Sequence, residues 1–61
     1  MVKGDICRFK VNYELSNNLF IHSGEIALIQ DVAGWYYRVF HFNSGRDFWA
    51  TKDIIEKLER Q

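Results

Sequence analysis

The side chains that most often do chemistry are sparse in this sequence. Its histidines are His22 and His41, and its one cysteine is Cys7. Catalysis requires convergent groups, such as a nucleophile beside a base, paired carboxylates, or a metal with an open position. No spacing of histidine, cysteine and acidic residues matches such a set or a zinc site. The sequence therefore predicts a protein that is not an enzyme and holds no metal or cofactor, with both histidines at the surface or at a strand edge.

The single cysteine also indicates where the protein works. Cys7 has no second cysteine to pair with, which is typical of a reducing compartment, and we expect it to be a small buried apolar residue. No apolar run approaches the length of a membrane span, and Met1 is not followed by the apolar stretch of a signal peptide. We therefore expect a cytoplasmic protein with no membrane contact.

Aromatic residues are the strongest functional signal. The 61 residues include five Phe, three Tyr and two Trp. A small barrel interior is filled mostly by aliphatic side chains, so some of these rings must be exposed. Exposed Trp and Tyr are typical of protein interfaces. We expect Tyr13, Trp35, Trp49 and Ile54 to form a surface that binds a protein partner, and a patch of this kind could equally bury itself in a homodimer.

Length and charge limit the number of domains and the classes of function that remain. A chain of 61 residues allows one domain, residues 1–61, and 48% hydrophobic with 26% charged residues is typical of a globular protein. The net charge is zero, with eight acidic and eight basic residues. Proteins that hold nucleic acid by neutralising phosphates are usually basic, so the balance argues against a general DNA binder. The charge balance does not argue against a local basic patch.

The first half of the chain predicts two strands that enclose a loop. Residues 6–11 follow a turn signal, and from Arg8 to Val11 charged and apolar side chains alternate, as in a strand with one face in solvent. The polar residues 16–18 predict a loop after Tyr13. Residues 25–32 form a second long strand with apolar side chains at both parities, so we expect both of its faces to be covered.

The second half predicts a hairpin and a terminal turn. Residues 35–42 are dense in aromatic and β-branched side chains; we expect Tyr37 and Val39 inward and Trp35 at the rim, since the opposite register would bury Arg38. Residues 43–45 close the hairpin onto a strand at 48–50. The segment from Thr51 is either a short helix capped by that residue or a 3₁₀ turn leading into a closing strand.

This pattern of short strands, close turns and a terminal turn resembles the SH3 domain. Residues 19–29 are similar to the family's alternating core residues, its diverging turn ending in Gly-Glu, and the strand that follows. Residues 7–11 take the place of the family's Ala-Leu-Tyr-Asp-Tyr motif, which leaves residues 12–18 as a loop. The resemblance implies an all-β fold, a small five-stranded SH3-like barrel with a short C-terminal helical or 3₁₀ turn. It also implies a core that includes Leu19, Ile21, Ala27 and Ile29.

The residues that would form the family's polyproline groove are mostly replaced. Trp35 follows a turn where SH3 domains place a groove wall, but Phe9 and Val11 stand at the motif tyrosines, Thr51 at the groove proline and Ile54 at the groove tyrosine. We therefore do not expect polyproline recognition. The chain is more similar to the stand-alone SH3-like barrels of bacteria, phages and organelles, many of which are accessory subunits.

Two functional hypotheses remain open. The first is a non-catalytic protein-interaction module or small accessory subunit, binding through the aromatic surface. The alternative is a nucleic-acid-binding barrel of the Tudor or KOW kind, in which Arg38, Arg46 and Lys52 meet phosphates and the aromatic rings stack on bases.

Overall fold

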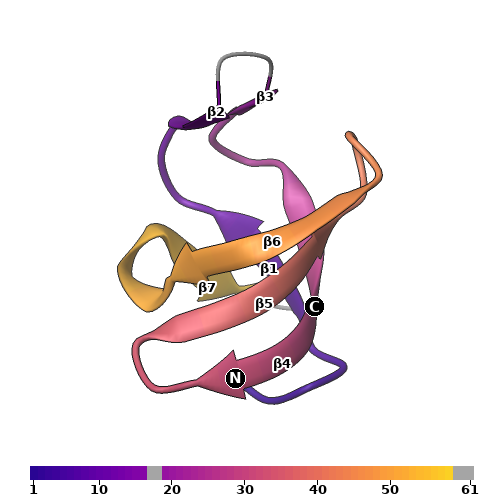
Figure 1. Cartoon of the computed structure of the whole chain (residues 1–61), viewed down its shortest axis with the longest axis vertical. Helices are drawn as coiled ribbons and strands as arrows, with labels where there is room; N and C mark the ends of the chain where they lie inside the picture. Colours follow the sequence, from indigo (N-terminus) through magenta and orange to yellow (C-terminus); the bar gives the residue numbers. More distant parts are fainter. Residues whose placement is uncertain (17–18, 59–61) are drawn as a thin grey trace.

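Residues 1–16 and 19–58, which the computed structural model describes, form seven short strands and one turn of 3₁₀ helix (Figure 1). This part of the chain contains no α-helix, so the all-β prediction is confirmed. In chain order the elements are β1 (Ile6–Phe9), β2 (Tyr13–Ser16), β3 (Leu19–Ile21), β4 (Ile26–Ala33), β5 (Tyr36–His41), β6 (Arg46–Thr51), the 3₁₀ helix η1 (Lys52–Ile54) and β7 (Ile55–Lys57).

The strands form two antiparallel sheets. Five of them pair in the order β6-β5-β4-β1-β7, and β2 pairs with β3 separately. In Figure 1 the β2–β3 hairpin stands beyond one end of the larger sheet, which is strongly twisted. The edge strands β6 and β7 do not pair with each other in the described part of the chain, so hydrogen bonds do not close the larger sheet into a ring.

Strand β2 corrects the loop predicted at residues 12–18. Tyr13 lies opposite Ile21 in antiparallel register, so the segment is extended and paired instead of irregular. Its apolar side chains explain this, because Tyr13 and Leu15 pack against the core and an extended backbone brings both into contact with it. Residues 17 and 18 lie outside the described residues.

The core lies between the inner faces of the strands. Alternate residues on each strand point inward, as the period of two requires. The predicted core positions Leu19, Ile21, Ala27 and Ile29 are all buried, as are Cys7, Tyr37 and Val39, so these predictions are confirmed. The buried apolar set is completed by Phe9, Phe48, Ala50 and Ile55.

Strand β4 is covered on one face only, which corrects the expectation for residues 25–32. Ala27 and Ile29 are buried, but Ile26 is 40% exposed and Leu28 is only half-buried. The apolar residues at the second parity therefore point away from the core. The presence of apolar side chains at both parities of a strand thus does not mean that both of its faces are buried.

The segment after β6 resolves the two alternatives left open for the C-terminal part. Thr51 makes no side-chain capping bond, and the turn that follows it is a single 3₁₀ helix. The chain then enters β7, which pairs with β1 and buries Ile55. The 3₁₀ turn leading into a closing strand is therefore the correct alternative.

Candidate binding surface

The four residues predicted to bind a partner do not form one patch. Trp35 lies in the turn between β4 and β5, while Trp49 lies on the outer face of β6. Tyr13 and Ile54 are partly buried and pack against the core. Trp35 and Trp49 are 81% and 41% exposed, whereas Tyr13 and Ile54 expose only part of their side chains.

Trp35 is the most exposed large apolar side chain among the described residues, at 81%. It forms one wall of a depression of about 430 Å³, which we call the Trp35 groove, lined by Trp35, Thr51, Lys52 and Asp53. The backbone N–H of Lys52 donates to the Trp35 carbonyl at 3.0 Å, which fixes the β4–β5 turn against η1. The groove therefore has a rigid base and an exposed aromatic wall.

Local backbone geometry explains why this tryptophan is presented to solvent. Gly34 has φ 58°, in the left-handed region that glycine adopts without steric cost, so the chain reverses tightly here. The reversal puts Trp35 at the tip, before β5 begins to alternate inward and outward. The ammonium of Lys52 lies 5.0 Å from the centre of the Tyr37 ring, which leaves Asp53 as the exposed charge at the groove.

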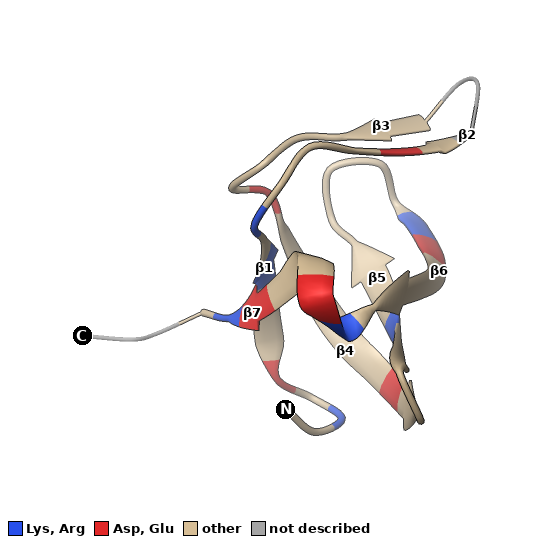
Figure 2. Cartoon of the chain, turned by 90° about the vertical axis from the view of Figure 1, so that its left-hand side faces the viewer, with Lys and Arg blue, Asp and Glu red and all other residues tan. Residues whose placement is uncertain are grey.

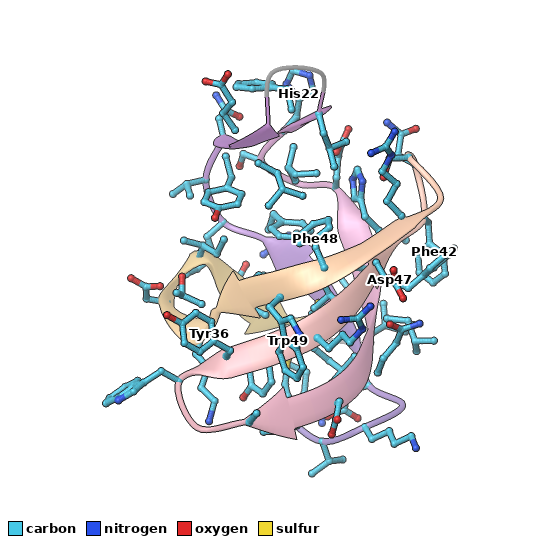
Figure 3. The ribbon with its side chains drawn as sticks, viewed as in Figure 1. His22, Tyr36, Phe42, Asp47, Phe48 and Trp49 are labelled. Atoms are coloured by element: carbon cyan, nitrogen blue, oxygen red, sulfur yellow. The ribbon has the colours of Figure 1, made fainter. Side chains whose placement is uncertain are left out.

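A second apolar surface lies on the outside of the β4–β5–β6 meander, and we call it the outer sheet face (Figure 3). Tyr36 and Trp49 are 49% and 41% exposed and, with Ala33, line a depression of about 340 Å³. Towards the other end of β5, the rings of Phe40 and Phe42 meet edge to face at 5.6 Å. The face comprises Ile26, Leu28, Asp31, Ala33, Tyr36, Arg38, Phe40, Phe42, Asp47 and Trp49.

The sequence shows which side chains of β5 face outward, but not which residues of other strands lie beside them. Tyr36, Arg38, Phe40 and Phe42 share one parity, and the inward direction of Tyr37 and Val39 necessarily turns them outward. What the sequence could not show is that Trp49 joins them, because that depends on the register in which Arg38 lies opposite Trp49.

The three basic residues proposed to meet phosphate are spread along β6. Arg46 lies opposite His41 at the start of the strand, Arg38 opposite Trp49 near its middle, and Lys52 follows its end. A strand rises about 3.3 Å per residue, so the two ends of β6 are roughly 17 Å apart. Basic and acidic segments are interspersed along the ribbon in Figure 2. These three side chains do not form a single basic patch.

Arg38 is also occupied by neighbours on its own face. Its guanidinium lies 3.1 Å from the Asp47 carboxylate, and its central carbon is 5.7 Å from the centre of the Trp49 ring. The acid neutralises the charge, and the ring covers one side of the guanidinium plane. A phosphate that bound here would share the guanidinium with the carboxylate.

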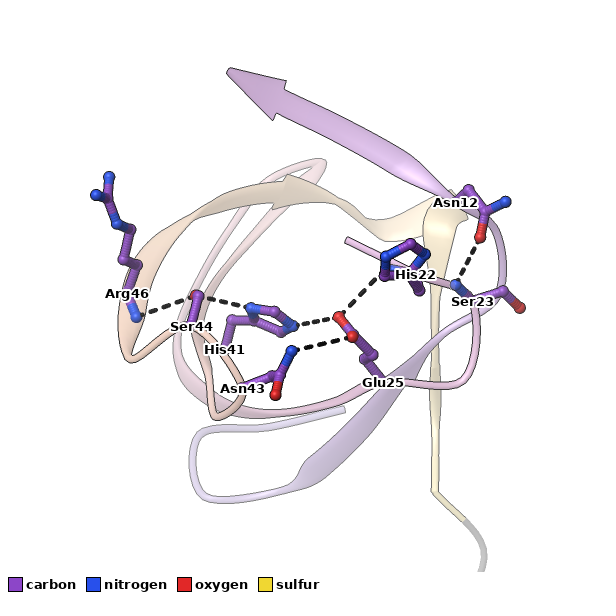
Figure 4. A network of polar contacts seen from close by, with 8 residues as sticks. All are labelled: Asn12, His22, Ser23, Glu25, His41, Asn43, Ser44 and Arg46. Atoms are coloured by element: carbon purple, nitrogen blue, oxygen red, sulfur yellow. Dashed lines mark hydrogen bonds and ion pairs between the residues drawn. The ribbon is translucent and has the colours of Figure 1, made fainter. Parts of the chain in front are cut away.

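His41 is buried, which corrects the prediction that it lies at the surface or an edge. It is 1% exposed, and its ring packs against those of Phe9 and Phe48. Nε2 donates to Glu25 Oε1 at 2.7 Å, because a carboxylate can only accept, and Nδ1 lies 2.8 Å from Ser44 Oγ (Figure 4). The partners make burial of this polar ring tolerable. His22 is exposed, as predicted.

The Ser44–His41–Glu25 chain contains the residue types of a hydrolytic triad, but its setting is structural. A depression of about 410 Å³ lies nearby, and it is lined by Glu25 and Asn43 but by neither His41 nor Ser44. A substrate held there would meet neither the hydroxyl nor the imidazole. We interpret the network as a tie between the start of β4 and the β5–β6 turn.

Glu25 is the charged centre of this network. Burial alone would raise the pKa of its carboxyl, but the His22 backbone N–H, the His41 ring and the positive charge of the two imidazoles together hold that pKa below its ordinary value of 4.5. The Asn43 amide donates to the second carboxylate oxygen at 3.2 Å. The carboxylate form is thus favoured by the folded structure.

Two other kinds of site were sought among the described residues. Residues 1–16 and 19–58 contain no cluster of three or more His, Cys, Asp or Glu side chains placed to hold a metal ion. In the same residues no helix has the length and apolar character needed to cross a membrane.

No protein-family model matches the chain, and no curated protein matches it. A function for the chain therefore has to rest on the Trp35 groove, the outer sheet face and the fold that positions them.

Proposed function

We propose that the chain is an SH3-like barrel that acts as a non-catalytic protein-interaction module, binding an extended segment of a partner protein at the Trp35 groove. The observation that carries this proposal is the 81% exposure of Trp35 beside an apolar depression with a fixed base. A tryptophan left in solvent loses the burial that normally stabilises so large a ring. Contact with a partner would restore that burial.

The strand order supports the fold part of the proposal. The sheet order β6-β5-β4-β1-β7 brings the last strand beside the first, and a 3₁₀ turn connects β6 to β7. This arrangement agrees with the SH3-like spacing of the sequence. In such a barrel the β4–β5 turn and the 3₁₀ turn lie together, which is where the Trp35 groove is found.

The lining of the groove indicates what kind of segment would bind. Trp35 offers a flat apolar ring, and Thr51 the edge of the adjoining strand. Asp53 is exposed beside them, whereas the Lys52 ammonium lies over Tyr37. The best-matched ligand is an extended peptide that lays an apolar side chain on the tryptophan and a basic side chain near Asp53.

The test is selection of peptides from a displayed random library on the intact chain, followed by calorimetric measurement of their affinity. Trp35→Ala should weaken binding of the selected peptides by about tenfold or more, the size of a hot-spot loss. The matched control is Phe20→Ala, which removes a ring 48% exposed on β3, at the opposite end of the molecule in Figure 1. That control should leave the affinity unchanged.

Two results would contradict the proposal. Equal affinity of the selected peptides for Trp35→Ala and for the unaltered chain would remove the groove from the binding site. Binding of a single-stranded oligonucleotide at low salt that falls steeply as salt is added would favour the nucleic-acid alternative instead.

A further inference from the structure

We propose that the outer sheet face is the contact surface between two copies of this chain. The proposal uses residues on the outside of the β4–β5–β6 meander and does not depend on the Trp35 groove. It rests on the exposed apolar side chains of that face and the arrangement of its one ion pair, together with the small size and zero net charge of the chain.

The outer sheet face concentrates exposed apolar side chains. Of the nine large hydrophobic residues exposed among those the structure describes, four lie on it: Ile26, Tyr36, Phe42 and Trp49. They fall into two groups, one around Tyr36 and Trp49 and the other around Phe40 and Phe42 (Figure 3). Such a concentration on one side of a small domain is typical of a surface that is covered in the working state.

The single ion pair of this face lies between the two apolar groups. Arg38 is opposite Trp49, and Asp47 is opposite Phe40, so the charged residues occupy one diagonal of a square and the aromatic residues the other. Arg38 and Asp47 keep 37% and 46% of their side-chain surface exposed. Both charges are therefore accessible to a second molecule that approaches the face.

This layout is self-complementary under a twofold axis. With the axis in the contact plane, passing midway between the two charges, Arg38 of each copy meets Asp47 of the other. This axis is perpendicular to the line from Arg38 to Asp47 and so runs along the other diagonal; the same rotation therefore brings Trp49 onto Trp49 and Phe40 onto Phe40 of the second copy. Two charge pairs and two aromatic contacts would then form together. An unrelated partner would make the same contacts only if its own surface carried charged and aromatic residues in the same alternating arrangement.

The size and charge of the chain favour a second copy as the occupant. A standard interface buries about 800 Å² on each partner, roughly a fifth of the 4234 Å² that this chain exposes. The net charge is zero, so two copies do not repel each other. A domain of this size also has a small core, and association would add to its limited stability.

The test is sedimentation equilibrium of the intact chain over a range of concentrations. The unaltered protein should approach twice its chain mass of 7.3 kDa as concentration rises. Arg38→Asp adds a third acid beside Asp31 and Asp47 on each face, and Asp47→Arg adds a second guanidinium group beside Arg38, so each variant alone should raise the dissociation constant by about tenfold or more. An equimolar mixture of the two variants should recover the dimer, because opposite charges then face each other.

Controls separate this interface from general effects of charge and folding. Lys57→Asp and Glu14→Arg make the same charge changes at exposed positions on β7 and β2, and they should leave the dissociation constant unchanged. Phe42→Ser removes an exposed ring without altering charge and should also weaken the dimer. Far-ultraviolet circular dichroism confirms that each variant is folded.

The result that overturns the proposal is a mass of one chain at every concentration of the unaltered protein. A dimer that forms equally well with Arg38→Asp and Phe42→Ser would also overturn it, because association would then use another surface. So would failure of the mixed variants to associate while the unaltered chain dimerises, since the proposed pairing of charges would be absent.

Discussion

The role of His41 follows from its neighbours rather than from its residue type. Its parity on β5 turns it inward with Tyr37 and Val39, and a buried imidazole is stable only if both ring nitrogens find partners. Ser44 is three positions away, but Glu25 is sixteen positions away, just before another strand. The sequence shows the parity of His41, whereas Glu25 becomes its second partner only once the sheet has formed.

Cys7 provides a prediction at the residue scale. Burial raises the pKa of its thiol from an ordinary 9.0 to about 11, so the folded protein keeps the proton at pH values where the unfolded chain loses it. The resulting contribution to stability is complete below pH 9.0 and is lost as the pH rises through about 11. The free energy of unfolding should fall by about 1 kcal/mol per pH unit in this window.

Urea unfolding at a series of alkaline pH values measures this effect, with Cys7→Ala as the reference. Other groups titrate in both proteins, so the difference between their two pH profiles isolates the thiol. Parallel profiles for Cys7→Ala and the unaltered chain would show that the thiol makes no such contribution.

At the scale of elements, the Glu25 network adds side-chain hydrogen bonds to the backbone pairing between the start of β4 and the end of β5. Glu25 immediately precedes β4, and Asn43 and Ser44 lie in the β5–β6 turn. The side chain of Glu25 accepts from both His41 and Asn43, so a single carboxylate holds the turn against the start of β4 (Figure 4). The β5–β6 hairpin therefore depends on a contact outside itself.

This tie predicts how the protein responds to acid. Because the pKa of Glu25 is below 4.5 in the folded state, its contribution to stability is present above that value and is lost as the pH falls through the lowered folded pKa. Glu25→Gln keeps an acceptor for His41 but cannot titrate. Urea midpoints of the variant should therefore decline less steeply below pH 4.5 than those of the unaltered chain. An identical decline would contradict the role assigned to Glu25.

At the scale of the whole molecule, the two exposed tryptophans mark two different surfaces. Trp35 stands at the tip of the β4–β5 turn and belongs to the Trp35 groove. Trp49 lies on β6 within the outer sheet face, beside Arg38. We therefore propose different partners for the two surfaces of this 61-residue chain, a peptide for the first and a second copy of the chain for the other.

Fluorescence of single-tryptophan variants distinguishes these surfaces. In Trp35→Phe the remaining Trp49 should shift its emission to shorter wavelength and become less accessible to acrylamide as concentration rises, because association buries it. In Trp49→Phe the remaining Trp35 should show neither change. A concentration-dependent shift of Trp35 with an unchanged Trp49 would place the contact between copies at the wrong surface.

The sequence by itself determined the all-β class, most of the core and the rim position of Trp35. These features depend on local alternation and turn residues, which are visible in a few consecutive positions. Leu19, Ile21, Ala27 and Ile29 are buried as the SH3-like spacing implied, and Tyr37 with Val39 points inward because Arg38 cannot. The 3₁₀ turn before β7 was one of two alternatives that the sequence left open.

Only the tertiary structure decided which of these residues lie together. The pairing of β2 with β3, the partners of His41, and the separation of Trp35 from Trp49 and of Arg46 from Lys52 all depend on strand register. Register joins residues far apart in the chain, and a slip of one position would reverse every side chain on the strand. The types of residue that could bind were thus readable from the sequence, but the surfaces that they form were not.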